Sequence, residues 1–220
     1  MNRKPPRRTR ERILDLSLRL FNDFGEPNVN TTLISDEMKI SPGNLYYHFK
    51  NKDDIINCIF QAFEREIDQV LAVPSGRNVN VEDVWLFLHL LFEQIWKYRF
   101  FYRDLNNLLA NNRILEIKFK RLLHDKVGVA RRLCEGLQGS GDLDASMQQI
   151  DALTTNMVVV ATYWLSYAYV LDPRRTNDPA VVDASLQLGC YQVMALMAPY
   201  LTGEARHLLE RLAGEYLDSQ

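Results

Sequence analysis

A short run of polar and aromatic residues near the N-terminus has the side chains that a DNA-binding surface needs. Positions 41–52 read Ser-Pro-Gly-Asn-Leu-Tyr-Tyr-His-Phe-Lys-Asn-Lys. Ser41 can cap a helix, and Pro42 suits its first turn, because the N–H that proline lacks is unpaired there in any case. Leu45 and Phe49 would then share one side of the helix. The spacing therefore predicts a helix over 42–49 that buries these two side chains and turns its polar residues outward.

The outward residues suggest two kinds of contact with DNA. A short helix can enter the major groove, where side chains near its N-terminus meet base edges. Asn44 and Tyr47 are the expected base readers. Tyr46 and His48 are expected to hold phosphates, as is Lys52, which would begin the next helix at an end that favours anions.

A second helix is expected just before this one, over about 32–38. Thr32 is its expected N-cap, and acidic residues follow in its early turns, where the helix dipole favours negative charge. The turn between the two helices falls at Lys39–Ile40. This arrangement predicts a helix-turn-helix between positions 31 and 54.

The order of these motifs resembles the DNA-binding domain of TetR-family transcriptional regulators. The family signature runs through Thr31-Thr32, the segment 41–49 and Lys52-Asp53, and the resemblance is close over about 10–60. It implies an all-α protein that binds an operator in double-stranded DNA. Leu33 departs from relatives that carry a base-reading arginine at its place. The expected DNA-binding residues are Thr31, Thr32, Ser41, Pro42, Gly43, Asn44, Tyr46, Tyr47, His48 and Lys52, together with Arg8 and Arg10 of the basic N-terminus.

The charge distribution agrees with a DNA-binding protein. The net charge of the 220-residue chain is −2, which alone argues against binding DNA. The first 20 residues, however, hold seven basic and two acidic side chains. A basic pole on an acidic body is the electrostatic pattern of DNA binders, and it predicts a phosphate or minor-groove arm at 1–8. A solubilising tail is the alternative.

The rest of the chain reads as helix, which predicts an all-α protein of two domains. The domain 1–54 comprises the basic arm, a supporting helix over 9–24 and the helix-turn-helix. The domain 55–220 is helical, and a long helix over 52–73 links the two. The family resemblance implies that this second domain binds a ligand and dimerises. Further helices are expected over 81–98, 102–110, 113–137, 145–170, 179–200 and 204–217.

The composition is that of a soluble globular protein, with 47% hydrophobic and 25% charged residues. Since no run of about 18 apolar residues and no apolar signal segment is present, neither a membrane partner nor secretion is expected. A cytoplasmic location follows, and the three widely spaced cysteines read as reduced thiols. His89 and Glu93 have a spacing that could hold a metal, but a bond along the helix is the commoner outcome. No cofactor, metal or catalytic activity is expected.

The aromatic side chains of the second domain could line an apolar ligand pocket or form a plain core. Pockets combine apolar walls with a few convergent polar groups, and the family resemblance implies a pocket in this domain. The candidate lining residues are His89, Phe92, Trp96, Phe101, Leu105, Asn156, Tyr163 and Tyr167.

The resemblance also implies a homodimer, because TetR relatives dimerise through their last two long helices. These correspond to 145–170 and 179–200, and internal packing is the alternative for their apolar faces. A two-fold protein suits a palindromic operator. The candidate interface residues are Leu186, Cys190, Val193 and Met197.

Over its whole length the sequence is similar to the PhaD-like branch of the family, which regulates polyhydroxyalkanoate genes. The segments FNDFGEPNVNT, ISPGNLYYHF, WLFLHL and YRFFYRDL carry this similarity. It implies an apolar effector, a fatty acid or an acyl-CoA. The expected function is a dimeric repressor that this effector releases from DNA. A small helical enzyme and a helical adaptor that use the aromatic cavity are the alternatives.

Overall fold

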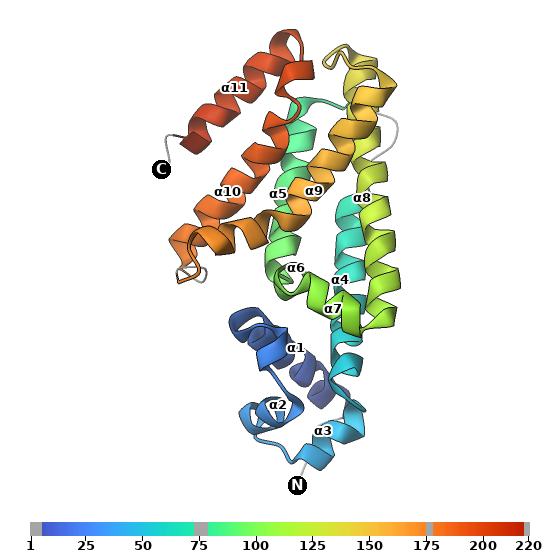
Figure 1. The fold of residues 1–220 in the computed structure, drawn as a ribbon, viewed down its shortest axis with the longest axis vertical. Coiled ribbons are helices and arrows are strands. Elements are labelled where there is room, and N and C mark those ends of the chain that lie inside the picture. The colour runs from blue at the N-terminus through green and yellow to red at the C-terminus, as the bar shows by residue number, and fades with distance from the viewer. Residues whose placement is uncertain (1–5, 73–78, 175–177, 218–220) are drawn as a thin grey trace. The chain divides into compact units, whose positions relative to one another are not determined.

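The computed structural model describes residues 6–72, 79–174 and 178–217, and its regular structure there is helical apart from an isolated bridge between Leu143 and Leu201 (Figure 1). The predicted all-α fold is confirmed. In chain order the elements are α1 (Pro6–Phe24), η1 (Glu26–Asn28), α2 (Thr31–Met38), α3 (Pro42–His48), α4 (Lys52–Leu71), α5 (Val81–Lys97), α6 (Phe100–Arg103), α7 (Leu105–Asn111), α8 (Arg113–Ser140), α9 (Met147–Leu171), α10 (Pro179–Ala195), η2 (Ala198–Tyr200) and α11 (Gly203–Leu217).

The chain forms two compact units. Unit 1 holds the residues up to Glu66 together with Tyr98–Lys118, and unit 2 holds Ile67–Lys97 and the residues from Phe119 onward. Helices α4 and α8 therefore each contribute residues to both units. The boundary expected from the sequence falls at position 54, whereas α6 and α7 group with the N-terminal helices.

Several helix ends differ from the sequence-based expectation for simple reasons. Helix α1 begins at Pro6, so residues 6–8 of the expected arm are helical, and residues 1–5 lie outside the described part of the chain. Proline is tolerated there because the first turn of a helix needs no N–H. The helix expected over 102–110 is divided into α6 and α7 at Asp104, whose φ of −103° and ψ of 16° are not helical.

The core of unit 1 joins α1, α4 and α6 through aromatic rings. The ring centroid of Phe21 in α1 lies 5.1 Å from that of Phe100 in α6. The centroid of Phe60 in α4 lies 5.1 Å from that of Phe101 in α6. Aromatic pairs at this separation contribute more to stability than their buried area alone accounts for. The short α6 is therefore part of the core that supports the N-terminal helices.

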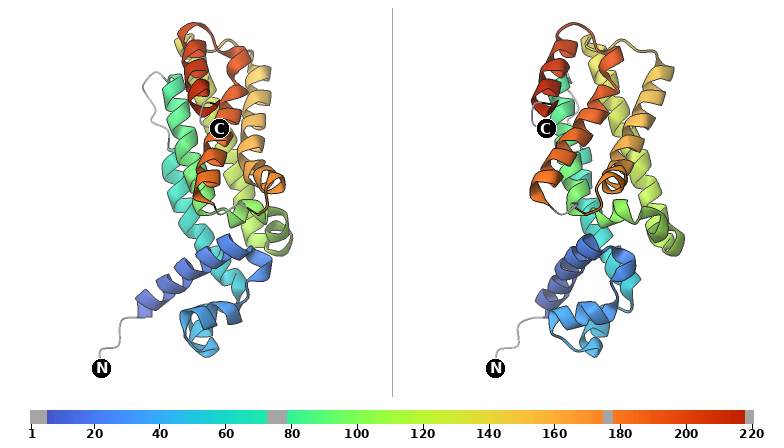
Figure 2. Two further views of the ribbon diagram at one scale, coloured as in Figure 1. Left: turned by 90° about the vertical axis from the view of Figure 1, so that its left-hand side faces the viewer. Right: turned by 60° about the vertical axis from the view of Figure 1, so that its left-hand side comes forward.

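Unit 2 is organised around α10, which packs against α5, α9 and α11 (Figure 2). The indole Nε1 of Trp164 in α9 donates to the carbonyl of Ser185 in α10 at 2.8 Å. A Cβ added at Gly189 would lie 2.7 Å from ring atoms of both Phe92 and Trp164. Glycine at this position thus allows α10 to approach α5 and α9 closely.

Two helical glycines, one in this close contact and one with free space around it, should respond in opposite ways to substitution by alanine. Gly189→Ala should lower the free energy of unfolding by about 1–2 kcal/mol, because the overlap outweighs the gain of about 1 kcal/mol in helix propensity. Gly128→Ala in α8 should raise it by about 0.5–1 kcal/mol. The added Cβ there meets only the flexible end of Arg132, at 3.6 Å. Urea unfolding of both variants checks the pair, and equal stabilisation by both would show that α10 is not held this tightly.

Candidate DNA-binding surface

The helix-turn-helix is set by its caps and one left-handed residue. Asn30 caps α2, because its side chain accepts from the N–H of Leu33 at 2.8 Å. The prediction of Thr32 as the cap is wrong, since the helix already includes Thr31. Lys39 ends α2 with a φ of 55°, and its N–H bonds back to the carbonyl of Asp36. That turn reverses the chain towards α3.

The second helix of the motif agrees with its predicted local structure. Ser41 caps α3 by accepting from the N–H of Asn44 at 3.2 Å, and Pro42 occupies the first position. Leu45 is fully buried and Phe49 is 3% exposed. Because seven residues do not make a stable isolated helix, this burial is what holds α3 in place.

The opposite side of α3 is open to solvent. The side chain of Tyr47 is 79% exposed, and its ring meets His48 edge-on with a centroid separation of 5.1 Å. Tyr46 is also exposed, and its hydroxyl lies 3.1 Å from that of Thr31 at the start of α2. Of the other residues expected to bind DNA in this segment, Thr31 and His48 are half-buried, and the exposed ones are Thr32, Ser41, Pro42, Gly43 and Asn44.

Lys52 is engaged within the protein. Its Nζ lies 2.6 Å from Oε1 of Glu26 and donates to the Glu26 carbonyl at 3.1 Å. The Glu26 side chain is only 8% exposed, so the ammonium neutralises a buried carboxylate. This side chain therefore ties η1 to the start of α4, and its expected phosphate contact stays a prediction. Lys50, just before α4, is exposed.

Arg10 is also directed at its own chain. Its Nη2 donates to Sγ of Cys58 at 2.9 Å, and its guanidinium carbon lies 4.9 Å from the centroid of the Phe49 ring. A cation over an aromatic face contributes about 0.5–1 kcal/mol at such a site. Arg10 thus packs α1 onto the end of α3, although the residue remains exposed, as Arg8 is.

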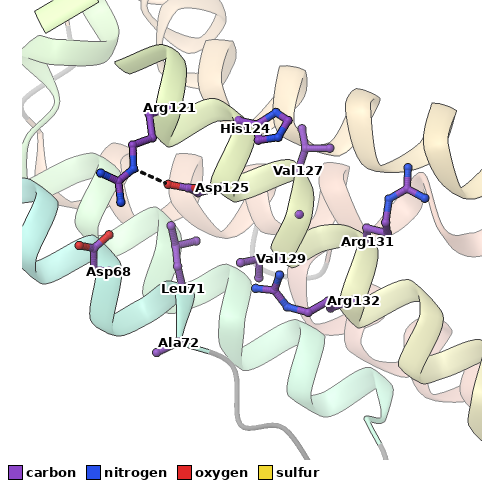
Figure 3. Close-up of a pocket in the computed structure, with 11 residues that line it drawn as sticks. Asp68, Leu71, Ala72, Arg121, His124, Asp125, Val127, Val129, Arg131 and Arg132 are labelled. Carbon is purple, nitrogen blue, oxygen red and sulfur yellow. Dashed lines mark ion pairs between the residues drawn. The ribbon is translucent and has the colours of Figure 1, made fainter. Parts of the chain in front are cut away.

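In unit 2 a cavity of about 630 Å³ opens between the end of α4 and the middle of α8 (Figure 3). Figure 3 shows Leu71 and Val129 among the central residues, with Arg121 towards one end and Arg131 towards the other. Arg121 pairs with Asp125 at 3.5 Å. None of the predicted pocket residues lines it. Its described lining consists of Asp68, Leu71, Ala72, Arg121, His124, Asp125, Val127, Gly128, Val129, Arg131 and Arg132.

The predicted pocket residues fall into three environments. Asn156, Tyr163 and Tyr167 are exposed on α9 in the single chain, and their place in a ligand pocket stays a prediction. Phe101 and Leu105 are buried in unit 1. The other three belong to α5 in unit 2: Phe92 is buried, and His89 and Trp96 are half-buried.

The predicted interface residues in and just after α10 lie mainly inside the protomer. Cys190, Val193 and Met197 are at most 1% exposed in the single chain, and Leu186 is half-buried. The first three are therefore corrected to core residues of unit 2. A helix face that packs within the chain has the same spacing of apolar residues as one that packs against a second copy, which is why the sequence did not separate them.

Two models of known protein families match the chain. Residues 62–209 match the TetR family model described as bacterial transcriptional repressor, and residues 13–59 match the model of bacterial regulatory proteins of the tetR family. The chain belongs to the TetR family. The regulator accordingly has the family's helix-turn-helix and C-terminal helical domain, and the family binds DNA operators, dimerises and is not enzymatic.

Individual relatives of the regulator agree with this assignment. The crystal structure of a TetR-family transcriptional regulator from Marinobacter aquaeolei VT8 is 36% identical, with a TM-score of 0.85 over 94% of this chain and 98% of that chain. An HTH-type transcriptional regulator of Staphylococcus aureus (strain USA300) is 35% identical over 66 residues, which span 30% of this chain and only 34% of that relative. A gamma-butyrolactone receptor (ArpA-like protein) shares the fold at 15% identity, with a TM-score of 0.66 over 98% of this chain and 99% of that one.

The ion pair of Lys52 predicts a difference between two neighbouring lysines of the regulator. Lys52→Ala should lower the free energy of unfolding by about 2–3 kcal/mol, because it leaves the buried Glu26 carboxylate without its cation. Lys50→Ala removes an exposed cation and should change the free energy by no more than about 0.5 kcal/mol. Chemical denaturation of the two variants measures both values. Equal stability would mean that Lys52 is not needed to neutralise Glu26.

Proposed function

We propose that this TetR-family regulator is a cytoplasmic repressor, which binds a palindromic operator as a dimer and is released by a small effector bound in unit 2. The observation that carries the DNA-binding part is the exposed side of α3. Leu45, on the opposite side of α3, is fully buried and fixes the position of the helix by packing. Asn44 and Tyr47 are exposed.

The residues of this surface divide into those suited to contact base edges and those suited to bind phosphates. Asn44 offers an amide, which can pair with the edge of an adenine, and Tyr47 offers a ring and a hydroxyl. The hydroxyls of Tyr46 and Thr31, 3.1 Å apart, are suited to one phosphate between α2 and α3. His48 and the exposed Lys50 extend the holding surface towards α4.

We place the dimer contact on the outward face of α9 and α10. Val159, Tyr163, Tyr167 and Val170 follow one side of α9 and are between 47% and 77% exposed. By length and hydropathy alone, Ala180–Tyr200 is apolar enough to cross a membrane, a property that core helices of soluble proteins share. Only 33% of its apolar stretch is buried in the single chain. A second copy of the same face would cover this apolar surface and generate the two-fold axis that a palindrome requires.

This placement predicts that one exposed tyrosine controls assembly. Tyr163→Glu should convert the dimer to a monomer, because two uncompensated carboxylates would be buried at the axis, at a cost of several kcal/mol. Leu86→Glu in α5 is the matched control, since Leu86 is 50% and Tyr163 is 47% exposed. Sedimentation velocity separates the two species. A dimeric Tyr163→Glu protein would place the interface elsewhere.

The effector is proposed to be a fatty acid or acyl-CoA. The proposal depends on the sequence similarity to the PhaD-like branch. An effector that releases the operator must bind the DNA-free form more tightly, and by linkage DNA weakens effector binding by the same factor.

Selection of genomic fragments by the purified protein tests this function. We expect recovery of a palindromic operator, loss of binding when a fatty acid or acyl-CoA is added, and a weaker operator complex for Tyr47→Ala. That substitution should cost about 1–3 kcal/mol on the operator and far less on random DNA. Recovery of no enriched sequence would contradict the repressor function. Enrichment that acyl compounds leave unchanged would remove only the effector.

A further inference from the structure

The buried carboxylate of Glu26 lies at the centre of a polar network in unit 1, which comprises Glu26, Lys52, Asp104 and Asn107. Its Oε1 pairs with Lys52 Nζ at 2.6 Å, and its Oε2 accepts from Asn107 Nδ2 at 3.1 Å. The N–H of Glu26 donates to Asp104 Oδ2 at 2.7 Å. Glu26 is 6% exposed, so its charge is satisfied almost entirely by protein groups.

This network joins three elements that are far apart in sequence. Glu26 belongs to η1, and Lys52 begins α4. Asn107 lies in α7, and Asp104 is the N-cap residue of that helix. Burial raises the pKa of Asp104, and the N–H of Glu26 partly opposes that rise. A buried charge that loses its partners is costly, so η1 and the start of α4 should follow a displacement of α7 rather than separate from it.

The helices that carry Asp104 and Asn107 also hold α1. The N–H of Phe100 donates to Asn22 Oδ1 at 3.1 Å, and Arg103 donates to the Asn22 carbonyl at 3.1 Å. Arg99 pairs with Asp23 at 2.9 Å. The segment 98–118 thus belongs to the DNA-binding unit, although its two chain ends continue into unit 2 through α5 and α8.

We propose that Glu26 is a positioning residue for DNA binding: it fixes the start of α4, and hence α3, to α7, so that a displacement of α7 reaches the DNA-reading helices. The inference deepens the proposed function, on which its regulatory meaning rests. Glu26 itself touches no DNA in this mechanism. Lys52 serves the same purpose by neutralising it.

Hydrogen exchange of the DNA-free protein tests the connection without any operator. Asn107→Ala removes the bond from the α7 side chain to the Glu26 carboxylate, and Asn106→Ala is the control, since Asn106 is a neighbour as exposed as Asn107 whose side chain makes no hydrogen bond in the described part of the chain. Asn107→Ala should speed exchange roughly tenfold in peptides that cover 25–29 and 52–56, the effect of one hydrogen bond to a charged group. Peptides of α9 and the Asn106→Ala protein should be unchanged. Faster exchange confined to α7, or equal acceleration throughout unit 1, would overturn the proposal.

Binding to DNA provides the second readout. On the operator recovered by selection, Asn107→Ala should weaken binding roughly tenfold, while affinity for random duplex of the same length stays within about twofold. A loss of stability alone would lower both affinities alike, and that result, or unchanged operator affinity, would contradict a positioning role. If the wild-type protein enriches no operator, the proposed function fails, whereas the exchange experiment still decides whether Glu26 connects the two helices.

Discussion

The DNA-reading helices depend on a carboxylate that has almost no contact with solvent. Glu26 is held from one side by Lys52 at 2.6 Å and from the other by Asn107 at 3.1 Å. Such an ion pair is weak evidence for net stability, because removing two charges from water is costly. The ion pair instead fixes relative positions, because the buried carboxylate keeps its partners only while η1, the start of α4 and α7 stay in place. Because the short α3 directly precedes α4, fixing the start of α4 also fixes the position of α3.

Much of this arrangement was predictable from local sequence signals. The Ser41 cap, Pro42 at the first position and the burial of Leu45 and Phe49 follow from rules that act within one turn of a helix. The position of Lys52 at a helix start was likewise correct. Its partner was not predictable, because Glu26 lies 26 residues away and looks like any acidic loop residue. Only the fold brings the two together.

The larger unit shows the limits of periodicity. The apolar spacing of α10 identified one face of the helix, and the structure buries that face inside the protomer through Cys190 and Val193. The exposed aromatic residues of α9, Tyr163 and Tyr167, were predicted to line a pocket because ligand sites combine apolar walls with a few polar groups. Their exposure makes them better suited to contact with a second copy than with an enclosed ligand. Residue type and spacing therefore predicted helices well but not which neighbour each face meets.

The division into two units gives regulation a physical basis. Helices α4 and α8 cross between the units, and α6 and α7 belong to the unit that carries α3. In the proposed mechanism, a signal from unit 2 passes along α4 and α8, which run through both units, and the Glu26 network distributes it within unit 1. The coupling can be no larger than the difference in effector affinity between the DNA-bound and free forms.

The central claim is that two copies of α3 read a two-fold-symmetric DNA site. Hydroxyl-radical footprinting of the regulator on its selected operator tests that claim most directly. The account predicts two protected stretches related by a dyad, with centres separated by about one helical turn of DNA or a multiple of it. Protection of a single asymmetric stretch, or uniform protection without a dyad, would contradict it.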